Sequence, residues 1–304
     1  MKLFPLRKWH HVSSIISHQP ENSPRKTLNE ITPQELTFIA DYVKRVTGIY
    51  LDQSKKYLIE SRFKPLMREL GINSFGEFNT KLSRDPALQK KVIDAITTRE
   101  TYFFRDNSPF ELLRNKIFPD MIAKKQRAAG AARPALRIWS AACSTGQEVY
   151  SIAIILKEII PNIERWDISI LGTDISDAAI QKASYAKYSR LEVERGLSPQ
   201  ALSRWFIPEA DVYKVRDEIR YMASFQKGNL LEPFSHLGKF DLIMARNVAI
   251  YFTHQDKIKL FERIAGQLNP EGALIVGASE SLTLYTQKFT IRQYLNAVYY
   301  EVKK

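Results

Sequence analysis

The first residues with a chemical signature lie between Arg137 and Tyr150, in the stretch RIWSAACSTGQEVY. A hydrophobic run predicts a strand, small residues up to Gly146 predict a tight turn, and the apolar run that follows predicts a helix. In open α/β sheets, ligands lie beyond the carboxyl end of such a strand. One glycine is too few for a dinucleotide fingerprint. An adenosine-bearing ligand without a tightly held pyrophosphate fits better, and S-adenosylmethionine is such a ligand; a purely structural turn is the alternative.

A carboxylate at a second strand end supports the ligand interpretation. Asp174 ends the hydrophobic run ISILGTD, 28 residues after Gly146. A carboxylate at this place can accept hydrogen bonds from both hydroxyls of a ribose. The sequence Asp174-Ile175-Ser176 is also typical of a helix N-cap. We therefore predict a ribose contact for Asp174, with a capping role as the competing explanation.

Three further stretches combine polar, charged and aromatic side chains. Arg105 lies in TTRETYFFRD, just before the α/β region, and can pair with a ligand carboxylate or form an ordinary surface ion pair. Asn229 follows a strand-like run and is placed to meet an adenine edge. The stretch RNVAIYF, residues 246–252, follows the buried run 240–245. It therefore stands at the sheet edge where ligands bind.

Other kinds of chemistry find little support in the sequence. The five histidines show no ligand spacing, so we expect no metal site. We interpret Cys143, the single cysteine, as a small side chain that fills the turn and not as a nucleophile. A single cysteine forbids an intramolecular disulfide, which agrees with a cytoplasmic location. No run of eighteen apolar residues occurs, so we expect no membrane insertion.

Length and charge indicate two domains and an acidic partner. The chain has 304 residues and a net charge of +12, and residues 1–130 hold 23 basic and 14 acidic residues. The N-terminal part therefore meets an acidic partner, or it simply carries a solvated basic face. We predict a mobile basic tail at 1–28, an all-helical domain at 29–96 and an α/β domain at 97–304.

The helical domain is predicted from caps and periodicity. The sequence Thr32-Pro33-Gln34-Glu35 predicts a helix start, and Gly48 predicts its end. A second helix is expected at about 53–70, with Pro65 as a possible bend. One of its faces is basic, which suits an acidic partner helix, although solvation explains most such faces. The basic residues on this face are Lys55, Lys56, Arg62, Lys64 and Arg68.

The α/β domain is predicted from buried and alternating runs. A helix is expected at 107–128, and strands are expected at 136–142, 168–174, 240–245, 273–277 and 294–302. Alternation at Val212–Val215 and Ile219–Met222 predicts a small antiparallel unit, inserted at about 186–227.

Together these stretches resemble the CheR-type methyltransferases, which methylate glutamates of bacterial chemotaxis receptors with S-adenosylmethionine. The resemblance covers nearly the whole chain from about residue 30 and keeps the family's motif order. It implies a Rossmann-like methyltransferase fold with a small antiparallel β-subdomain and an N-terminal all-helical domain. The motifs are TTRETYFFRD, SAACSTGQEVYS, GTDIS, GNLLEPF, RNVAIYF and LNPEGALIVGASESL.

The resemblance also implies cofactor contacts, residue by residue. Thr101 and Arg105 would hold the methionine end of the cofactor, and Glu148 would meet its amino group. Asp174 would hold the ribose. The further contacts implied are Asn229 and Leu230 beside the adenine, and Arg246 and Asn247 along the cofactor.

For catalysis, the resemblance implies that Tyr251 and Arg105 face the reacting methyl group. Lys55, Lys56, Arg62 and Arg68 are our candidates for contact with the receptor helices. Arg99 departs from the pattern, since many relatives carry asparagine there.

We expect the partner to be the cytoplasmic helices of a receptor, and the enzyme to act as a monomer. Nucleic acid is not expected, because residues 246–251 lack the prolines of base-methylating enzymes. A sensor or scaffold that binds S-adenosylmethionine, or an enzyme acting on another acidic acceptor, are the alternatives. The connection IPEADVYK after Phe206 is short and lacks glycine. In some members of the family that the sequence resembles, the β-subdomain holds a peptide at the receptor's C-terminus, and a longer loop with glycine is associated with this tether. We therefore hypothesise that this enzyme does not depend on such a tether.

Overall fold

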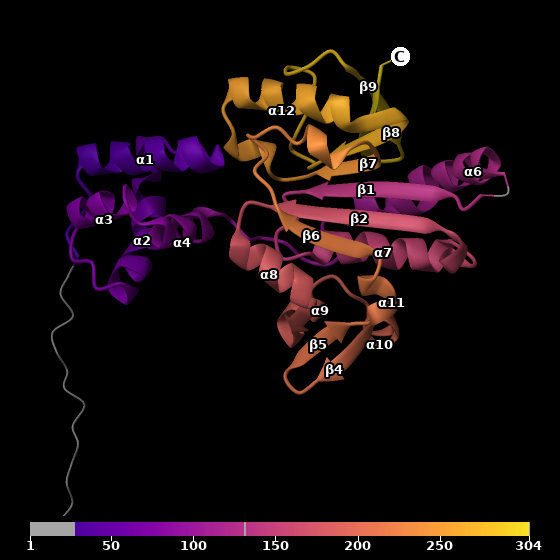
Figure 1. The fold of residues 1–304 in the computed structure, drawn as a ribbon, viewed down its shortest axis with the longest axis horizontal. Coiled ribbons are helices and arrows are strands. Elements are labelled where there is room, and N and C mark those ends of the chain that lie inside the picture. The colour runs from indigo at the N-terminus through magenta and orange to yellow at the C-terminus, as the bar shows by residue number, and fades with distance from the viewer. Residues whose placement is uncertain (1–27, 131, 304) are drawn as a thin grey trace, which may run out of the picture.

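The computed structural model describes residues 28–130 and 132–303 (Figure 1). The predicted tail lies outside these residues, apart from Leu28. The N-terminal unit is helical, and its elements are α1 (Pro33–Thr47), η1 (Gln53–Lys55), α2 (Lys56–Glu69), α3 (Phe75–Leu82) and α4 (Pro86–Ile96).

Both predicted ends of α1 are confirmed. The Thr32 side chain accepts from the Glu35 amide, while the Glu35 carboxylate accepts from the Thr32 amide, which completes a capping box. Gly48 ends the helix in the left-handed conformation, at φ 79°. Pro65 lies inside α2 without ending it. The unit has its own core, centred on fully buried Ile39 and Phe63.

The main sheet has seven strands in the order β6-β2-β1-β7-β8-β10-β9. The five strands from β6 to β8 are parallel, and β10 and β9 extend the sheet as an antiparallel pair. The strands are β1 (Ala135–Ala141), β2 (Asp167–Asp174), β6 (Ala223–Lys227), β7 (Phe240–Ala245), β8 (Leu268–Val276), β9 (Phe289–Tyr294) and β10 (Ala297–Val302).

Helices cover both faces of this sheet (Figure 1). Ile138 packs into one core and its neighbour Trp139 into the other, as alternation along a strand requires. The predicted helix 107–128 is interrupted by a π-helical turn. The helical elements are α5 (Ser108–Leu112), η2 (Leu113–Ile117), α6 (Phe118–Ala129), α7 (Gln147–Ile159), η3 (Ile163–Arg165), α8 (Asp177–Tyr185), α11 (Asp217–Arg220), η4 (Ser235–Leu237), η5 (Ala249–Tyr251) and α12 (His254–Gln267).

A second, small sheet has the order β3-β5-β4, and it is accompanied by two short helices. Its elements are β3 (Lys187–Ser189), α9 (Arg190–Glu194), α10 (Pro199–Trp205), β4 (Phe206–Glu209) and β5 (Val212–Val215). An inserted antiparallel unit was expected, but two details of the prediction are wrong. The run 219–222 begins in helix α11 and is not a strand, and β6 belongs to the main sheet, so the insertion ends before residue 223.

The predicted C-terminal strand 294–302 is also wrong in part. The chain turns at Leu295, which has a positive φ of 49°, and the residues on either side form the hairpin β9–β10. No helix among the described residues is both long enough and apolar enough to cross a bilayer.

Candidate functional site

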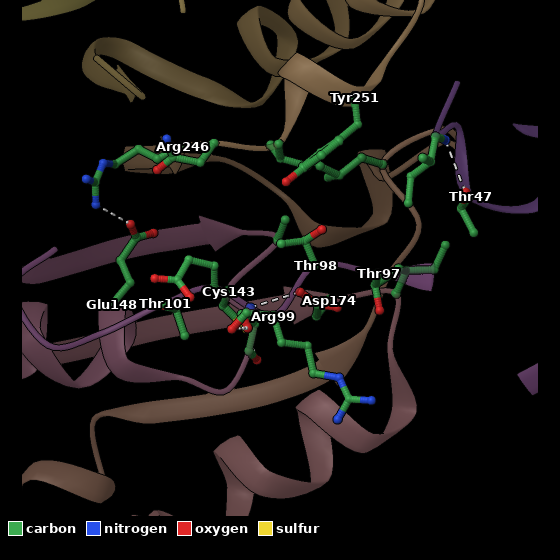
Figure 2. A pocket seen from close by; sticks show the side chains of 18 of the residues that line it. Thr47, Thr97, Thr98, Arg99, Thr101, Cys143, Glu148, Asp174, Arg246 and Tyr251 are labelled. Atoms are coloured by element: carbon green, nitrogen blue, oxygen red, sulfur yellow. Dashed lines mark hydrogen bonds and ion pairs between the residues drawn. The ribbon is translucent and has the colours of Figure 1, made fainter. Parts of the chain in front are cut away.

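A cavity opens at the carboxyl ends of β1, β2 and β7 (Figure 2). Every residue predicted for the cofactor or for catalysis lines it. These residues are Thr101, Arg105, Glu148, Asp174, Asn229, Leu230, Arg246, Asn247 and Tyr251. The carboxyl ends of parallel strands meet at one sheet edge, which is why segments far apart in sequence converge here.

Asp174 stands at the end of β2 and is not a helix cap. Ser176 caps α8, because its side chain accepts from the Ala179 amide. The Asp174 carboxylate accepts from the amides of Ser144, at 2.8 Å, and Ser176, at 2.9 Å. Burial raises its pKa, although these amides oppose the shift. Each oxygen keeps acceptor capacity, so the carboxylate can still receive two hydroxyl groups.

Glu148 and Arg246 form a buried ion pair at one side of the cavity (Figure 2). Arg246 Nη1 donates to Glu148 at 2.8 Å, and Nη2 donates to Asp106 and to the Arg105 carbonyl, both at 2.8 Å. Ser140 donates to the second oxygen of Glu148 at 2.8 Å. The Arg246 side chain is 2% exposed. Two carboxylates match the charge of Arg246. Through its ion pairs with Glu148 and Asp106, Arg246 joins the start of α7 to the segment before α5.

The turn between β1 and α7 brings backbone close to any ligand. Ala142 and Ser144 adopt positive φ angles of 61° and 50°. A side chain at Gly146, where φ is 92°, would come within 2.9 Å of Ala183, so only glycine fits. Cys143 also lines the cavity. Burial, together with Asp174 and Glu148, raises the pKa of its thiol, which disfavours the nucleophilic thiolate.

The loop after β7 presents Asn247 and Tyr251 to the cavity, and Glu280 holds this loop in place. The Glu280 carboxylate accepts from the amides of Asn247, at 2.7 Å, Gly277, at 2.8 Å, and Ile250, at 3.2 Å. Asn247 has a positive φ of 55°. No motif in the sequence marked Glu280 as part of the site, although it lies within the stretch GASESL.

The segment between the two units forms the opposite wall. Arg105 donates one hydrogen bond to the Glu100 carbonyl and reaches the cavity beside Thr101. Arg99 is also at the cavity edge, but its side chain turns away from Glu148 and Tyr251 (Figure 2) and donates to the Asp94 carbonyl at 2.9 Å.

The helical unit completes the cavity with Thr47 and Ile49, which the sequence analysis missed. The Tyr50 amide donates to the Tyr251 carbonyl at 2.9 Å, and the Asn229 side chain donates to the Val46 carbonyl at 3.1 Å. Asn229 therefore fastens the helical unit beside the predicted adenine position. No sequence pattern links α1 to this cavity, so only the packed structure could reveal these residues.

The predicted basic face lies away from the cavity. Lys55, Arg62 and Arg68 are exposed on η1 and α2. Lys56 is half-buried and pairs with Glu30 at 2.9 Å, so its charge is already matched. Lys64 likewise pairs with Glu60.

The sheet order, the cavity at the strand ends and the carboxylate that ends β2 define a Rossmann-like methyltransferase that uses S-adenosylmethionine. The chain belongs to the CheR methyltransferase family. The model of the family's all-alpha domain matches residues 34–97, and the model of its SAM-binding domain matches residues 99–298. The family and the fold class inferred from the sequence are thus confirmed.

Similar proteins carry names that agree with the family. The chemotaxis protein methyltransferase Cher2 of Pseudomonas putida is 37% identical over 86% of this chain and 95% of its own length. Chemotaxis protein methyltransferase 1 of Vibrio cholerae is 37% identical over 90% of this chain and 98% of its own. Among solved structures, the plantazolicin methyltransferase BpumL in complex with SAH covers 65% of this chain and 55% of its own, with 15% identity and a TM-score of 0.28.

The residues present fit S-adenosylmethionine. Asp174 offers buried acceptors for ribose hydroxyls, and Glu148 offers acceptors for an ammonium group. The buried Arg246 Nε has no hydrogen-bond partner among the described residues. When bound, the cofactor supplies an electrophilic methyl group on a sulfonium.

Proposed function

We propose that this enzyme transfers the methyl group of S-adenosylmethionine to glutamate side chains of chemotaxis receptors and forms glutamyl methyl esters. The observation that supports this most is that Arg105 and Tyr251 line the same cavity as the cofactor residues. A cation and a phenol beside the methyl position suit an anionic oxygen acceptor.

The reaction needs alignment more than it needs a base. A glutamate has a pKa of about 4.3, so its carboxylate is already ionised at neutral pH. A carboxylate oxygen attacks the methyl carbon in line, the carbon–sulfur bond breaks, and the bonding pair leaves with sulfur. A cation and an anion become a neutral ester and a thioether, so exclusion of water favours the step.

Arg105 is better placed than Arg246 to orient the acceptor. Arg246 is committed to Glu148, Asp106 and the Arg105 carbonyl. The Arg105 guanidinium donates to the Glu100 carbonyl and has further N–H groups for a carboxylate. We assign Tyr251 to the other side of the acceptor oxygen, where its hydroxyl would fix the angle of attack.

We assign receptor docking to the exposed cations of the helical unit, Lys55, Arg62 and Arg68. Receptor cytoplasmic helices carry the acceptor glutamates, so their surface is acidic and complements this face. We give Lys56 a smaller role, because it pairs with Glu30 on the surface. The site of action is then the cytoplasm, and we propose that the enzyme acts as a monomer.

The small sheet bears on the tether hypothesis. The expected short connection after Phe206 is the hairpin β4–β5, whose turn is only Ala210 and Asp211. This tight turn supports our proposal that the enzyme works without binding a receptor tail. Titration with a receptor-tail peptide tests the idea, and micromolar binding would contradict it.

The proposed reaction is tested with radiolabelled S-adenosylmethionine and membranes that carry chemoreceptors. We expect label on the receptor that mild base releases as methanol, since only a carboxyl methyl ester does so. Cofactor binding without receptor label would point to another acidic acceptor or to a sensor. Receptors with the acceptor glutamates changed to alanine are the control.

A further inference from the structure

The small sheet β3-β5-β4 reaches both walls of the cofactor cavity, although no residue of its strands lines that cavity. Its contacts go to the turn that follows β1, residues 142–146, and to the segment that carries Arg105, residues 100–106. These two pieces must keep a fixed relation, because the first holds the cofactor and the second meets the acceptor.

The first contact is made by Tyr188 on β3. This side chain is fully buried, and its hydroxyl donates to the Thr145 carbonyl at 2.7 Å. The same hydroxyl lies 3.2 Å from where a Cβ of Gly146 would stand. Tyr188 therefore supports the turn that places Ser144 against Asp174. Burial raises the pKa of this phenol, so it remains a donor at neutral pH.

The second contact is aromatic and binds the Arg105 segment. Phe103 is fully buried between Tyr188, with ring centroids 5.1 Å apart, and Phe206 on β4, with centroids 5.3 Å apart. Both pairs are edge-to-face, a favoured arrangement. Phe103 stands two residues before Arg105, so the position of its ring sets where the guanidinium emerges.

The third contact comes from the turn after α9. Gly196 has a φ of 99°, and a Cβ there would overlap the carbonyl oxygen of Phe103. Arg195 lies over the Tyr102 ring at 4.2 Å and pairs with Glu100. The backbone of this turn thus lies directly against the segment that carries Arg105.

We propose that the small sheet, together with the turn after α9 that lies between its strands in sequence, is a positioning element of the methyltransferase site. Tyr188 supports the cofactor turn, and Gly196 and Phe206 seat the Arg105 segment. This role requires no peptide bound to the sheet. This positioning role rests on the proposed methyl transfer only where kcat is measured. The Kd for S-adenosylmethionine is measured without an acceptor and does not depend on it.

Tyr188→Phe tests the support of the cofactor turn. The ring keeps its packing and only the donor to Thr145 is lost, so we expect the Kd for S-adenosylmethionine to rise about fivefold to tenfold in calorimetry. Tyr213→Phe is the matched control. Tyr213 on β5 is the strand partner of Tyr188 on β3, and its hydroxyl has no hydrogen bond within the described ranges. We expect its Kd to stay within about twofold of the wild type.

Gly196→Ala tests the seating of the Arg105 segment. The methyl group must push the Phe103 carbonyl away, so we expect kcat to fall about tenfold or more, with a smaller change in cofactor Kd. Gly71→Ala is the control, because Gly71 also has a positive φ, of 66°, but no atom lies within 4 Å of its Cβ position.

Two results would overturn the proposal. One is an unchanged Kd for S-adenosylmethionine in Tyr188→Phe. This variant keeps the fold, so its result decides the question even if Gly196→Ala does not fold. The other is a wild-type kcat in Gly196→Ala, because a lower thermal midpoint with unchanged turnover marks a purely structural role. If chemoreceptors are not the acceptor, the wild type shows no turnover with them. The Kd values of the variants for S-adenosylmethionine still test the positioning role in that case.

Discussion

The cavity has two walls that are held in different ways. The strand-end wall consists of residues 142–144, Glu148, Asp174 and Arg246, whose polar groups are largely buried and joined by short hydrogen bonds. The helical-side wall consists of Thr47, Ile49, residues 97–101 and Arg105. Its links to the rest include the backbone bond from Tyr50 to Tyr251 and a bond from Ser176 to Asp94.

This difference separates two tasks. Groups fixed by a parallel sheet are preorganised, so they suit recognition of a constant ligand such as the cofactor. The part of the other wall that comes from the helical unit, Thr47 and Ile49, is joined to the α/β unit by few hydrogen bonds, so it can adapt more easily to the acceptor. We therefore expect changes in the strand-end wall to affect cofactor affinity, and changes in the helical-side wall to affect turnover or acceptor binding.

The largest effect is expected from Asp174→Asn. The amide keeps one acceptor but loses the charge that strengthens hydrogen bonds from ribose hydroxyls, at a cost of about 3 kcal/mol, or a roughly 100-fold higher Kd for S-adenosylmethionine. Calorimetry measures this. Asp167→Asn, at the exposed start of the same strand, is the control. An unchanged Kd would remove the ribose role from Asp174.

The same residue predicts a pH dependence. Burial raises the pKa of Asp174, so its carboxylate takes up a proton at higher pH than an exposed aspartate does. Cofactor affinity should therefore fall as the pH falls through this raised pKa, and Asp174→Asn should flatten the profile. In the free enzyme, the contribution of Asp174 to the free energy of unfolding declines as pH rises from the unfolded to the folded pKa. A Kd that is constant from about pH 4 to 8 contradicts the assignment.

A smaller effect, confined to turnover, is expected from Tyr251→Phe. Loss of the hydroxyl should lower kcat about 30-fold, because one aligning group disappears from the acceptor side. Cofactor Kd should stay within about twofold of the wild type. Tyr221→Phe, whose side chain is 85% exposed, serves as the control. If Kd rises and kcat holds, Tyr251 binds cofactor and does not align the acceptor.

The basic face should give a weaker effect, specific to the acceptor. We expect the double variant Arg62→Glu and Arg68→Glu to raise the receptor KM about tenfold, less so at high salt, with unchanged cofactor Kd. The double variant Arg84→Glu and Lys90→Glu makes the same charge change at two other exposed positions of the helical unit and should act normally. Equal receptor KM values for the two proteins would place docking elsewhere.

The smallest effect is expected at the link between the units. Asp94→Ala removes the acceptor of Ser176 and should lower the free energy of unfolding by about 1 kcal/mol. The cofactor Kd should rise about threefold or less, because the helical unit mainly shields the cavity from solvent. Asp41→Ala on exposed α1 is the control. A change as large as that of Asp174→Asn would erase the distinction between the two walls.

The sequence by itself determined the strand-end wall. Hydrophobic runs that end in small or polar residues predicted β1, β2 and β7, and parallel strands must bring those ends together at one edge. The residues that the family resemblance implied near these strand ends, Glu148 and Tyr251 among them, all line the cavity for this reason. Helix α1 was equally predictable, because its capping box and Gly48 act within a few residues.

Only the tertiary structure decided the contacts between segments far apart in the chain. The docking of Thr47 and Ile49 at the cavity, the hold of Glu280 on the loop after β7, and the support from Tyr188 depend on packing that no local pattern encodes. The run 219–222 shows the same limit. Its alternation suits a strand, but β5 already pairs with β4, and the run begins in helix α11 instead. Local periodicity specifies which face of an element is buried, but the partner of that face is chosen by the whole fold.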